Sequence, residues 1–296
     1  MIFRIMNRLL FSVIVMFLIF SCQKYEQMMP EYKIDKDLYV SVESLVSAKT
    51  SIDQDNNILW SAGDQLIAFM QTTLGEKYQI KDEYVGSFNG GFSYVSDSVA
   101  GDDLETGQEI DHNVILYPYN EDATCWRNDD ENPTASYLVR TELPYIQSYA
   151  ENSFANESFP MIAVSDDNRL TFRNVCGCIK LRFVGTHKLK SIKLEGLAGE
   201  VLSGPCSIAT YVNGNAPSVE MSSTGNKSVI LDCGEGVQLD ETNPKTFVIT
   251  VPPVTFESGM KITVTDTYGF TQVLTNSSAN TVRRSCILKF PVINYV

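Results

Sequence analysis

Apolar and polar residues alternate with a period of two along much of the chain. The clearest alternation covers residues 178–183, CIKLRF, and further examples cover residues 37–46, 192–195 and 260–265. Successive side chains of a strand point to opposite faces of its sheet, so each stretch predicts a strand with one buried and one solvated face. Denser apolar runs, at Leu66–Met70 and Val114–Tyr117, predict buried strands.

Turn signals separate these stretches. Asn213-Gly214 is a strong hairpin signal, and Asp266–Gly269 joins two alternating runs. No segment of helical length keeps an apolar stripe with a 3.6-residue period, so we predict an all-β protein of β-sandwich type. The 296 residues suit two domains, which we place at residues 37–175 and 176–296, with a single large β-domain as the alternative.

The N-terminal residues predict export and a lipid anchor. Arg4 and Arg8 precede an apolar run, Leu9–Phe20, that has signal-peptide length and is short of the ~20 residues needed to span a bilayer. The run leads into Cys22 in a pattern that resembles a bacterial lipobox. We therefore expect residues 1–21 to be a lipoprotein signal peptide, Cys22 to be lipidated, with palmitate among the acyl chains, and residues 22–36 to form a tether. An ordinary secretory signal with a chance cysteine is the alternative.

The charge balance argues against one class of partner. The chain has 23 Lys and Arg against 36 Asp and Glu, a formal net charge of −13. This negative charge repels phosphate backbones, and the chain lacks the basic patch that nucleic-acid binding requires. We therefore expect no nucleic-acid partner.

Residues that carry catalysis or hold metals are few. His112 and His187 lie in no motif, and no nucleophile elbow, phosphate-binding loop or metalloprotease helix occurs. Six cysteines follow the lipobox and permit three disulfides, but Cys176 and Cys178 are better placed to pack as small apolar residues than to bond to each other. We expect no enzymatic activity, no cofactor and no metal site. Trp126, beside acidic loop residues, is the candidate for contact with a ligand such as a sugar ring.

A series of short strings resembles the fimbrillin-family lipoproteins of the Bacteroidales. They are strand and turn motifs whose order and spacing behind a lipobox carry the resemblance. The strings are Ala48-Lys49-Thr50, Trp60–Gln65, Leu143–Gln147, Ser153-Phe154, Phe159–Met161, Asn174–Gly177, Gly196–Gly204 and Gly259–Thr275.

The resemblance implies two tandem transthyretin-like Greek-key β-sandwiches in a pilin-like adhesin subunit on the outer membrane, at the cell surface or in a fimbrium. Its partners would be other fimbrial subunits and a surface receptor or glycan. In polymerising members of the family, a protease cuts in the loop after the first strand, and a strand of the neighbouring subunit fills the groove that opens. Carried onto this chain, the removable strand contains Leu38, Val40 and Val42, and the loop contains Lys49.

One feature departs from the family pattern, and the C-terminal residues have two possible roles. Residues 9–126 contain no arginine, so an arginine-specific protease has no site and Lys49 or Lys36 would have to serve. Alternatively, the precursor is never cut and stays anchored. Pro291 interrupts the alternation of residues 286–296, which are either a donor arm or the last strand of the second sandwich.

Two functional hypotheses follow from these observations. The first is a lipid-anchored fimbrial or adhesin subunit that assembles by donor-strand addition and mediates adhesion. The alternative is a glycan-binding lipoprotein of a polysaccharide-uptake system, which would share the anchor, the β-sandwiches and exposed aromatic residues.

Overall fold

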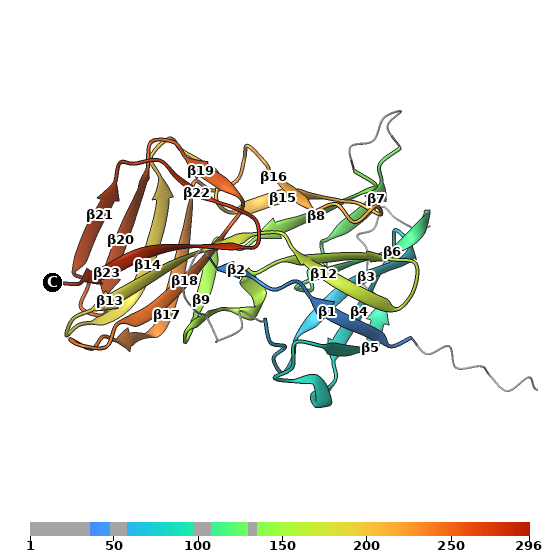
Figure 1. The fold of residues 1–296 in the computed structure, drawn as a ribbon, viewed down its shortest axis with the longest axis horizontal. Coiled ribbons are helices and arrows are strands. Elements are labelled where there is room, and N and C mark those ends of the chain that lie inside the picture. The colour runs from blue at the N-terminus through green and yellow to red at the C-terminus, as the bar shows by residue number, and fades with distance from the viewer. Residues whose placement is uncertain (1–35, 48–57, 98–107, 130–134) are drawn as a thin grey trace, which may run out of the picture. The chain divides into compact units, whose positions relative to one another are not determined.

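The computed structural model describes residues 36–47, 58–97, 108–129 and 135–296, all within one compact unit (Figure 1). The regular structure of these residues is strand, apart from two 3-10 helices, η1 (Asp82–Tyr84) and η2 (Asn156–Ser158). The predicted all-β class is therefore confirmed. Within the described ranges, no helix has the length and apolar character needed to cross a membrane.

Seven strands form a closed barrel. In hydrogen-bonded order they are β1 (Leu38–Val42), β12 (Arg169–Asn174), β11 (Met161–Ser165), β6 (Glu109–Tyr117), β3 (Gln65–Thr72), β4 (Gly75–Ile80) and β5 (Gly90–Asp97). The strands predicted at residues 66–70 and 114–117 are confirmed as β3 and β6. β1 is parallel to β12 and antiparallel to β5, so it closes the barrel between them (Figure 1).

A four-stranded sheet packs its side chains into the same hydrophobic cluster as the barrel. Its order is β16 (Ser218–Met221), β15 (Gly204–Thr210), β8 (Tyr137–Leu143) and β7 (Thr124–Arg127). Val139 of β8 and Ile208 of β15 are both fully buried in that cluster. The predicted hairpin turn at Asn213-Gly214 lies between β15 and β16, and Gly214 has the positive φ of +80° that such turns favour.

Two further sheets enclose the second cluster, and a short ribbon lies beside them. The larger sheet has the order β10 (Ser153–Phe154), β9 (Ile146–Ala150), β17 (Ser228–Gln238), β14 (Lys188–Gly196), β20 (Met260–Asp266) and β21 (Thr271–Asn276). The smaller sheet has the order β18 (Lys245–Val251), β13 (Gly177–Val184), β23 (Cys286–Asn294) and β2 (Val46–Ser47). The ribbon is β19 (Val254–Phe256) with β22 (Asn280–Val282).

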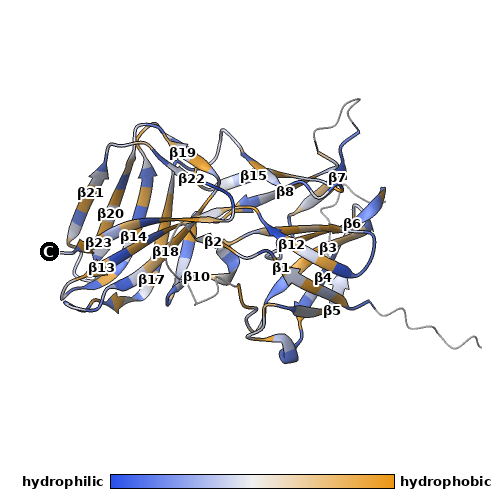
Figure 2. Ribbon diagram, viewed as in Figure 1, coloured by the Kyte–Doolittle hydropathy of each residue, from blue (hydrophilic) through white to orange (hydrophobic). Residues whose placement is uncertain are grey.

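The predicted alternation is visible in the buried face of β13. Ile179, Leu181 and Phe183 are fully buried, whereas Lys180 and Arg182 face away from the core. Apolar and polar bands alternate along many of the strands in Figure 2. This is the pattern of a sheet with one face on a core and one face in water.

The apolar residues form two clusters that divide within β13. Cys178 belongs to the first cluster and Ile179 to the second. Three strand pairs nevertheless join the two predicted halves, because β2 pairs with β23, β9 with β17 and β8 with β15. The domain boundary between residues 175 and 176 stays a prediction.

The strand expected over residues 37–46 is divided in two. β1 ends at Val42, residues 43–45 are outside any strand, and β2 joins a different sheet. The break begins at Glu43, whose side chain is bound by Arg284 rather than facing solvent as the alternation suggested. A period of two predicts the faces of one strand, and it does not predict where that strand leaves its sheet.

The C-terminal residues form the last strand of the second half. β23 is parallel to β13, and the register shifts between Lys180 and Arg182, opposite the segment that contains Pro291. Proline has no N–H to donate, and an irregular pairing accommodates it. Residues 286–294 are therefore a strand within their own sheet and not an extended donor arm.

Candidate strand-exchange site

β1 is the first strand after the predicted tether, and it has a neighbour on each side. Val40 lies opposite Leu170 of β12 and opposite Gly90 of β5. The Tyr39 N–H donates to the carbonyl of Asn168 at 2.9 Å. Without β1, the facing edges of β12 and β5 would lose their main-chain partners, and unpaired edges of this kind accept another strand.

The apolar side chains of β1 enter the barrel core. Leu38 is fully buried, Val40 is 4% exposed and Val42 is half-buried. Gly90 permits the close packing, because a Cβ at this position would lie 2.7 Å from Cγ2 of Val40 and 2.8 Å from Nε1 of Trp60. Each fully buried side chain of this size contributes about 1.5–3 kcal/mol, so the apolar face of β1 is a substantial part of what holds the strand.

Polar contacts fix the beginning of β1. Lys81 forms an ion pair with Asp37, and the hydrogen bond from Lys81 to Asp37 raises the pKa of this lysine. Lys36, one of the two predicted cleavage sites, lies just before the strand. Its ammonium is 3.4 Å from Oε1 of Glu76 and 4.2 Å from the ring centroid of Tyr94, while its side chain is 51% exposed.

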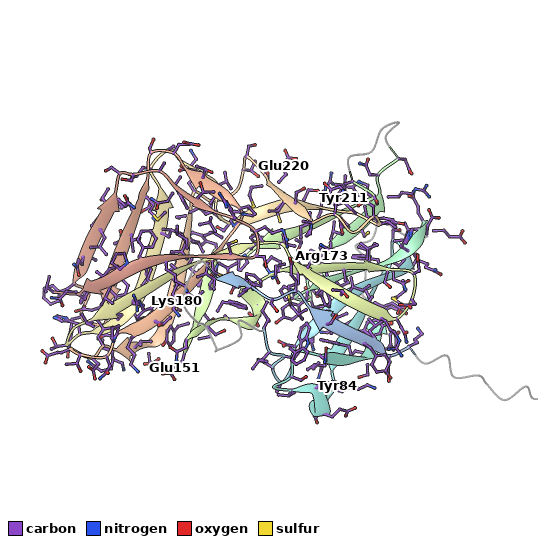
Figure 3. The ribbon with its side chains drawn as sticks, in the orientation of Figure 1. Tyr84, Glu151, Arg173, Lys180, Tyr211 and Glu220 are labelled. Atoms are coloured by element: carbon purple, nitrogen blue, oxygen red, sulfur yellow. The ribbon has the colours of Figure 1, made fainter. Side chains whose placement is uncertain are left out.

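Glu43, directly after β1, is bound by groups from two distant parts of the chain. Arg284 donates from Nη1 to Oε2 at 2.6 Å and from Nη2 to Oε1 at 2.9 Å, which is the bidentate geometry of strong carboxylate pairs. The Asn174 N–H donates to Oε2 at 3.1 Å. Burial raises the pKa of Glu43, but the hydrogen bonds and charge of Arg284, the Asn174 N–H and the charge of Arg173 outweigh burial, so this pKa lies below its ordinary value. Arg173 is labelled on β12 in Figure 3.

The main chain after Glu43 is held by the same region. Asn174 Nδ2 donates to the Glu43 carbonyl at 3.1 Å and to Oγ of Ser285 at 2.8 Å. Ser285 Oγ donates in turn to the Ser44 carbonyl at 3.3 Å. Arg284 Nη1 also donates to the Asn174 carbonyl at 2.8 Å, and the buried Oδ1 of Asn174 has no hydrogen-bond partner. We name Asn174, Arg284 and Ser285 together the latch.

The structure places only some of the predicted site residues. Leu38, Val40 and Val42 lie together in β1, and Lys36 precedes them. Cys22 and Lys49 lie outside the described residues. The lipidation and cleavage assignments therefore stay predictions.

Trp126 lies apart from the strand site, on β7. Its side chain is half-buried, and the guanidinium carbon of Arg140 is 4.7 Å from its ring centroid. Arg140 therefore occupies one face of the ring that a sugar would use. Trp60, the other tryptophan, is 2% exposed and packs edge-on against Phe92 and Tyr117.

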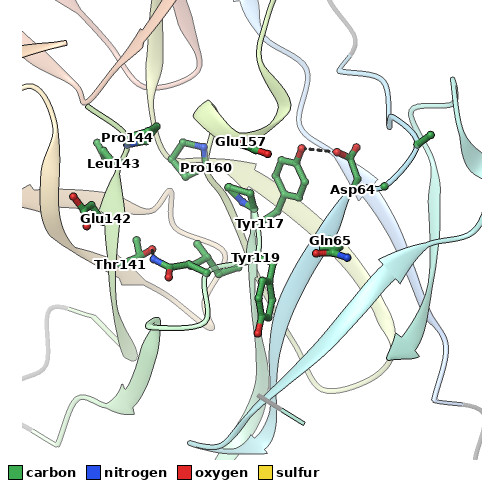
Figure 4. Close-up of a pocket in the computed structure, with 15 residues that line it drawn as sticks. Asp64, Gln65, Tyr117, Tyr119, Thr141, Glu142, Leu143, Pro144, Glu157 and Pro160 are labelled. Carbon is green, nitrogen blue, oxygen red and sulfur yellow. Dashed lines mark hydrogen bonds between the residues drawn. The ribbon is translucent and has the colours of Figure 1, made fainter. Parts of the chain in front are cut away.

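A cavity of about 460 Å³ lies where β3, β6 and β8 meet (Figure 4). On its wall, the Tyr117 hydroxyl donates to Oδ1 of Asp64 at 3.0 Å, and the Ser61 N–H donates to Oδ2 at 2.7 Å. Burial, followed by the charge of Asp64, raises the pKa of Tyr117. Glu142 and Glu157, on the rim, are exposed. Asp64 thus fixes the turn before β3 through satisfied hydrogen bonds, which is a structural role.

The cysteines of the described chain are all free thiols. Cys176 and Cys178 are fully buried, as their predicted packing role requires. Burial raises the pKa of Cys178 to about 12, so this thiol is a poor nucleophile at neutral pH.

The two histidines have different partners. His112 lies 3.1 Å from Asp166, and His187 lies 2.7 Å from Asp266. Among the residues that the structure describes, no group of three His, Cys, Asp or Glu side chains could hold a metal ion.

Sequence reasoning missed the role of Glu43 and of Arg284. The period of two assigned Glu43 to the solvated face of its strand, and its partner is 241 residues away in the chain. The available signals were Asn174, which belongs to one of the fimbrillin-like strings, and the adjacent arginines just before the last strand. Neither signal shows that these residues meet Glu43.

The comparisons with known proteins bear on the fold. No protein-family model matches the chain, and no curated protein matches it in sequence. A Bacteroides ovatus protein described as a "putative cell adhesion protein" aligns with a TM-score of 0.50 and 11% identity, over 87% of this chain and 91% of its own.

Two further solved structures are similar to the chain. A Bacteroides uniformis protein with the same description has a TM-score of 0.44 and 13% identity, over 88% of this chain and 93% of its own. The tip fimbrial protein Mfa3 of Porphyromonas gingivalis has a TM-score of 0.26 and 10% identity, over 86% of this chain and 94% of its own. The Bacteroides ovatus structure confirms, at the level of the fold, the resemblance to Bacteroidales adhesion proteins that the sequence predicted.

Proposed function

We propose that this protein is a fimbrial or adhesin subunit, held on the outer membrane by a lipid on Cys22, in which β1 is a replaceable strand. The observation that carries the proposal is the position of β1. It is the first strand after the tether, it pairs on both sides, and it fills the barrel with Leu38 and Val40. The description of the Bacteroides ovatus fold relative as a cell adhesion protein supports the adhesive role.

Loss of β1 would create an acceptor groove. The groove would have β12 and β5 as its walls, and the positions of Leu38, Val40 and Val42 would be its pockets. An incoming strand gains affinity from main-chain hydrogen bonds and specificity from alternate side chains. Three to five apolar side chains would contribute on the order of 10 kcal/mol before the entropic cost of ordering the strand.

The two predicted cleavage sites have opposite consequences. Lys36 precedes β1, so cleavage there would separate the fold from the lipid and leave the strand in its sheet. Lys49 follows β2, so cleavage there would leave β1 attached to the lipid and held in the fold by non-covalent contacts alone. Only cleavage at Lys49 makes the groove available.

β23 is part of its own sheet, and this favours the role of a strand acceptor for this subunit. β23 pairs with β13 along its length, Ile287 near its start is 1% exposed, and Tyr295, directly after its end, is 3% exposed. A strand that fills its own core is not free to fill the groove of a neighbour. We propose that this subunit accepts a strand from another subunit, as a terminal or anchoring member of an assembly would.

The proposal is tested on lipoprotein extracted from cell membranes. Intact mass and N-terminal analysis report acylation at Cys22, with Cys22→Ser as the unacylated control. Limited treatment with a lysine-specific endoprotease should produce a new N-terminus at Thr50 in the wild type and in Lys36→Gln, and should not do so in Lys49→Gln.

The clipped protein is then mixed with labelled β1 peptide, and the amount of label that it captures is measured. Excess unlabelled β1 peptide serves as the competitor. Capture by the clipped wild type and not by Lys49→Gln is the expected result. A clipped protein that retains its own strand and admits no peptide, even after prolonged incubation in mild denaturant, contradicts the proposal. A protein without acylation contradicts the anchor.

A further inference from the structure

The latch contacts residues 43 and 44, which follow β1 and lie beyond its apolar residues Leu38, Val40 and Val42. We infer that Asn174, Arg284 and Ser285 form a carboxylate-reading site that selects the incoming strand. The class of ligand is a strand with alternating apolar residues followed at once by Asp or Glu. This inference rests on the proposed strand replacement and names the chemistry of the partner.

The geometry of Arg284 fits a carboxylate. Its two terminal nitrogens reach both oxygens of Glu43, at 2.6 and 2.9 Å, and the Asn174 N–H adds a third donor at 3.1 Å. A planar guanidinium with a converging N–H recognises carboxylates better than it recognises neutral amides. Arg173 adds positive charge to the same region.

The latch also loses its partners when residues 43 and 44 leave. Asn174 is fully buried and Ser285 is 1% exposed. Asn174 Nδ2 would lose the Glu43 carbonyl, and Ser285 Oγ would lose the Ser44 carbonyl. A buried donor without an acceptor is costly, so an incoming strand that continues past the barrel and places a carbonyl and a carboxylate here is favoured over one that ends at the apolar positions.

The location of the latch adds specificity. Glu43 follows Val42 directly, so the acid must come immediately after the third apolar position of the strand. A strand shifted by one residue would place its apolar side chains outside the barrel. The apolar pockets and the latch together therefore fix both register and sequence.

β23 of a second copy of this chain does not offer such a strand. Residues 286–296, CILKFPVINYV, contain no acidic residue and carry Lys289 at an alternating position. They are also paired within their own sheet. The ligand that fits the latch is therefore a strand of a different subunit that carries the acid, or the chain's own β1.

The test uses the full chain clipped at Lys49 and labelled peptides of residues 37–47, with binding followed by fluorescence anisotropy. The peptides are the wild-type sequence, Glu43→Gln and Glu43→Lys. We expect Glu43→Gln to bind about tenfold more weakly than the wild type, because one partner of a partly exposed charge pair is lost. On clipped Arg284→Glu protein, the wild-type peptide should weaken by at least about tenfold, and Glu43→Lys should bind better than the wild type.

Arg283→Glu is the matched control, since it makes the same charge change at the neighbouring, exposed residue. It should alter the affinity of the wild-type peptide by less than about threefold. Equal binding of all three peptides to every protein overturns the carboxylate-reading site and leaves strand replacement intact. Failure of every peptide to bind, in a clipped protein with native circular dichroism, overturns strand replacement itself.

Discussion

Leu38→Ala measures how much the barrel depends on β1. Leu38 is fully buried in the first hydrophobic cluster, and Val40 of the same strand packs closely against Gly90. A leucine truncated in a core that cannot collapse costs about 2–5 kcal/mol, from the lost transfer free energy and the cavity that remains. Against a total stability of about 5–15 kcal/mol for a folded protein, this is a large loss.

Urea unfolding followed by the emission of Trp60 provides the measurement. The chain has two tryptophans, so a Trp126→Phe background makes Trp60 the single reporter of the barrel core. A loss of about 3 kcal/mol at a slope of about 3 kcal/mol per molar urea lowers the midpoint by roughly 1 M. Val95→Ala on β5 is the control, because Val95 is 48% exposed and its truncation should cost less than about 0.5 kcal/mol.

Equal midpoints for Leu38→Ala and Val95→Ala would refute this reasoning. Such a result would mean that Leu38 does not fill the core in solution. β1 would then be too weakly held for its loss to open a groove, and the acceptor function would lose its physical basis.

Three further predictions concern the polar network, the thiols and the pocket. The folded pKa of Glu43 lies below its unfolded value, so its ionised form contributes stability above about pH 4.5, and this contribution disappears as the pH falls through the lowered pKa. The unfolding free energy of the wild type should therefore fall more steeply between about pH 5 and pH 3 than that of Glu43→Gln. Parallel curves for the two proteins would contradict the latch. Ellman's reagent should label at most Cys286 rapidly in the native protein that starts after Cys22, and all six thiols after unfolding; fewer than six would reveal a disulfide. Tyr117→Phe removes the donor to the buried Asp64 and should cost about 1–3 kcal/mol in urea unfolding, whereas a neutral result would mean that water replaces the hydroxyl.

The local pattern of the sequence was sufficient for the strands and insufficient for their connections. The alternation over residues 178–183 predicted the buried face of β13, because facing a core is a local property of a strand. The alternation over residues 37–46 predicted β1 and failed after Val42, since Glu43 is held by Arg284. No local signal reports a pairing over 241 residues. The site was therefore predictable as a strand and unpredictable as a latch.

The contacts of residues 36–47 couple the barrel to the second half of the chain. β1 belongs to the barrel, whereas β2 pairs with β23, and Glu43 between them binds Arg284. Departure of this segment removes one strand from the barrel and, at the same time, a connection between the two hydrophobic clusters. An incoming strand with the apolar residues alone would restore the barrel, whereas one that also carries the acid would restore the connection. The proposed strand replacement would therefore have two energetic parts, and the second part would make the affinity for a partner strand depend on its charge.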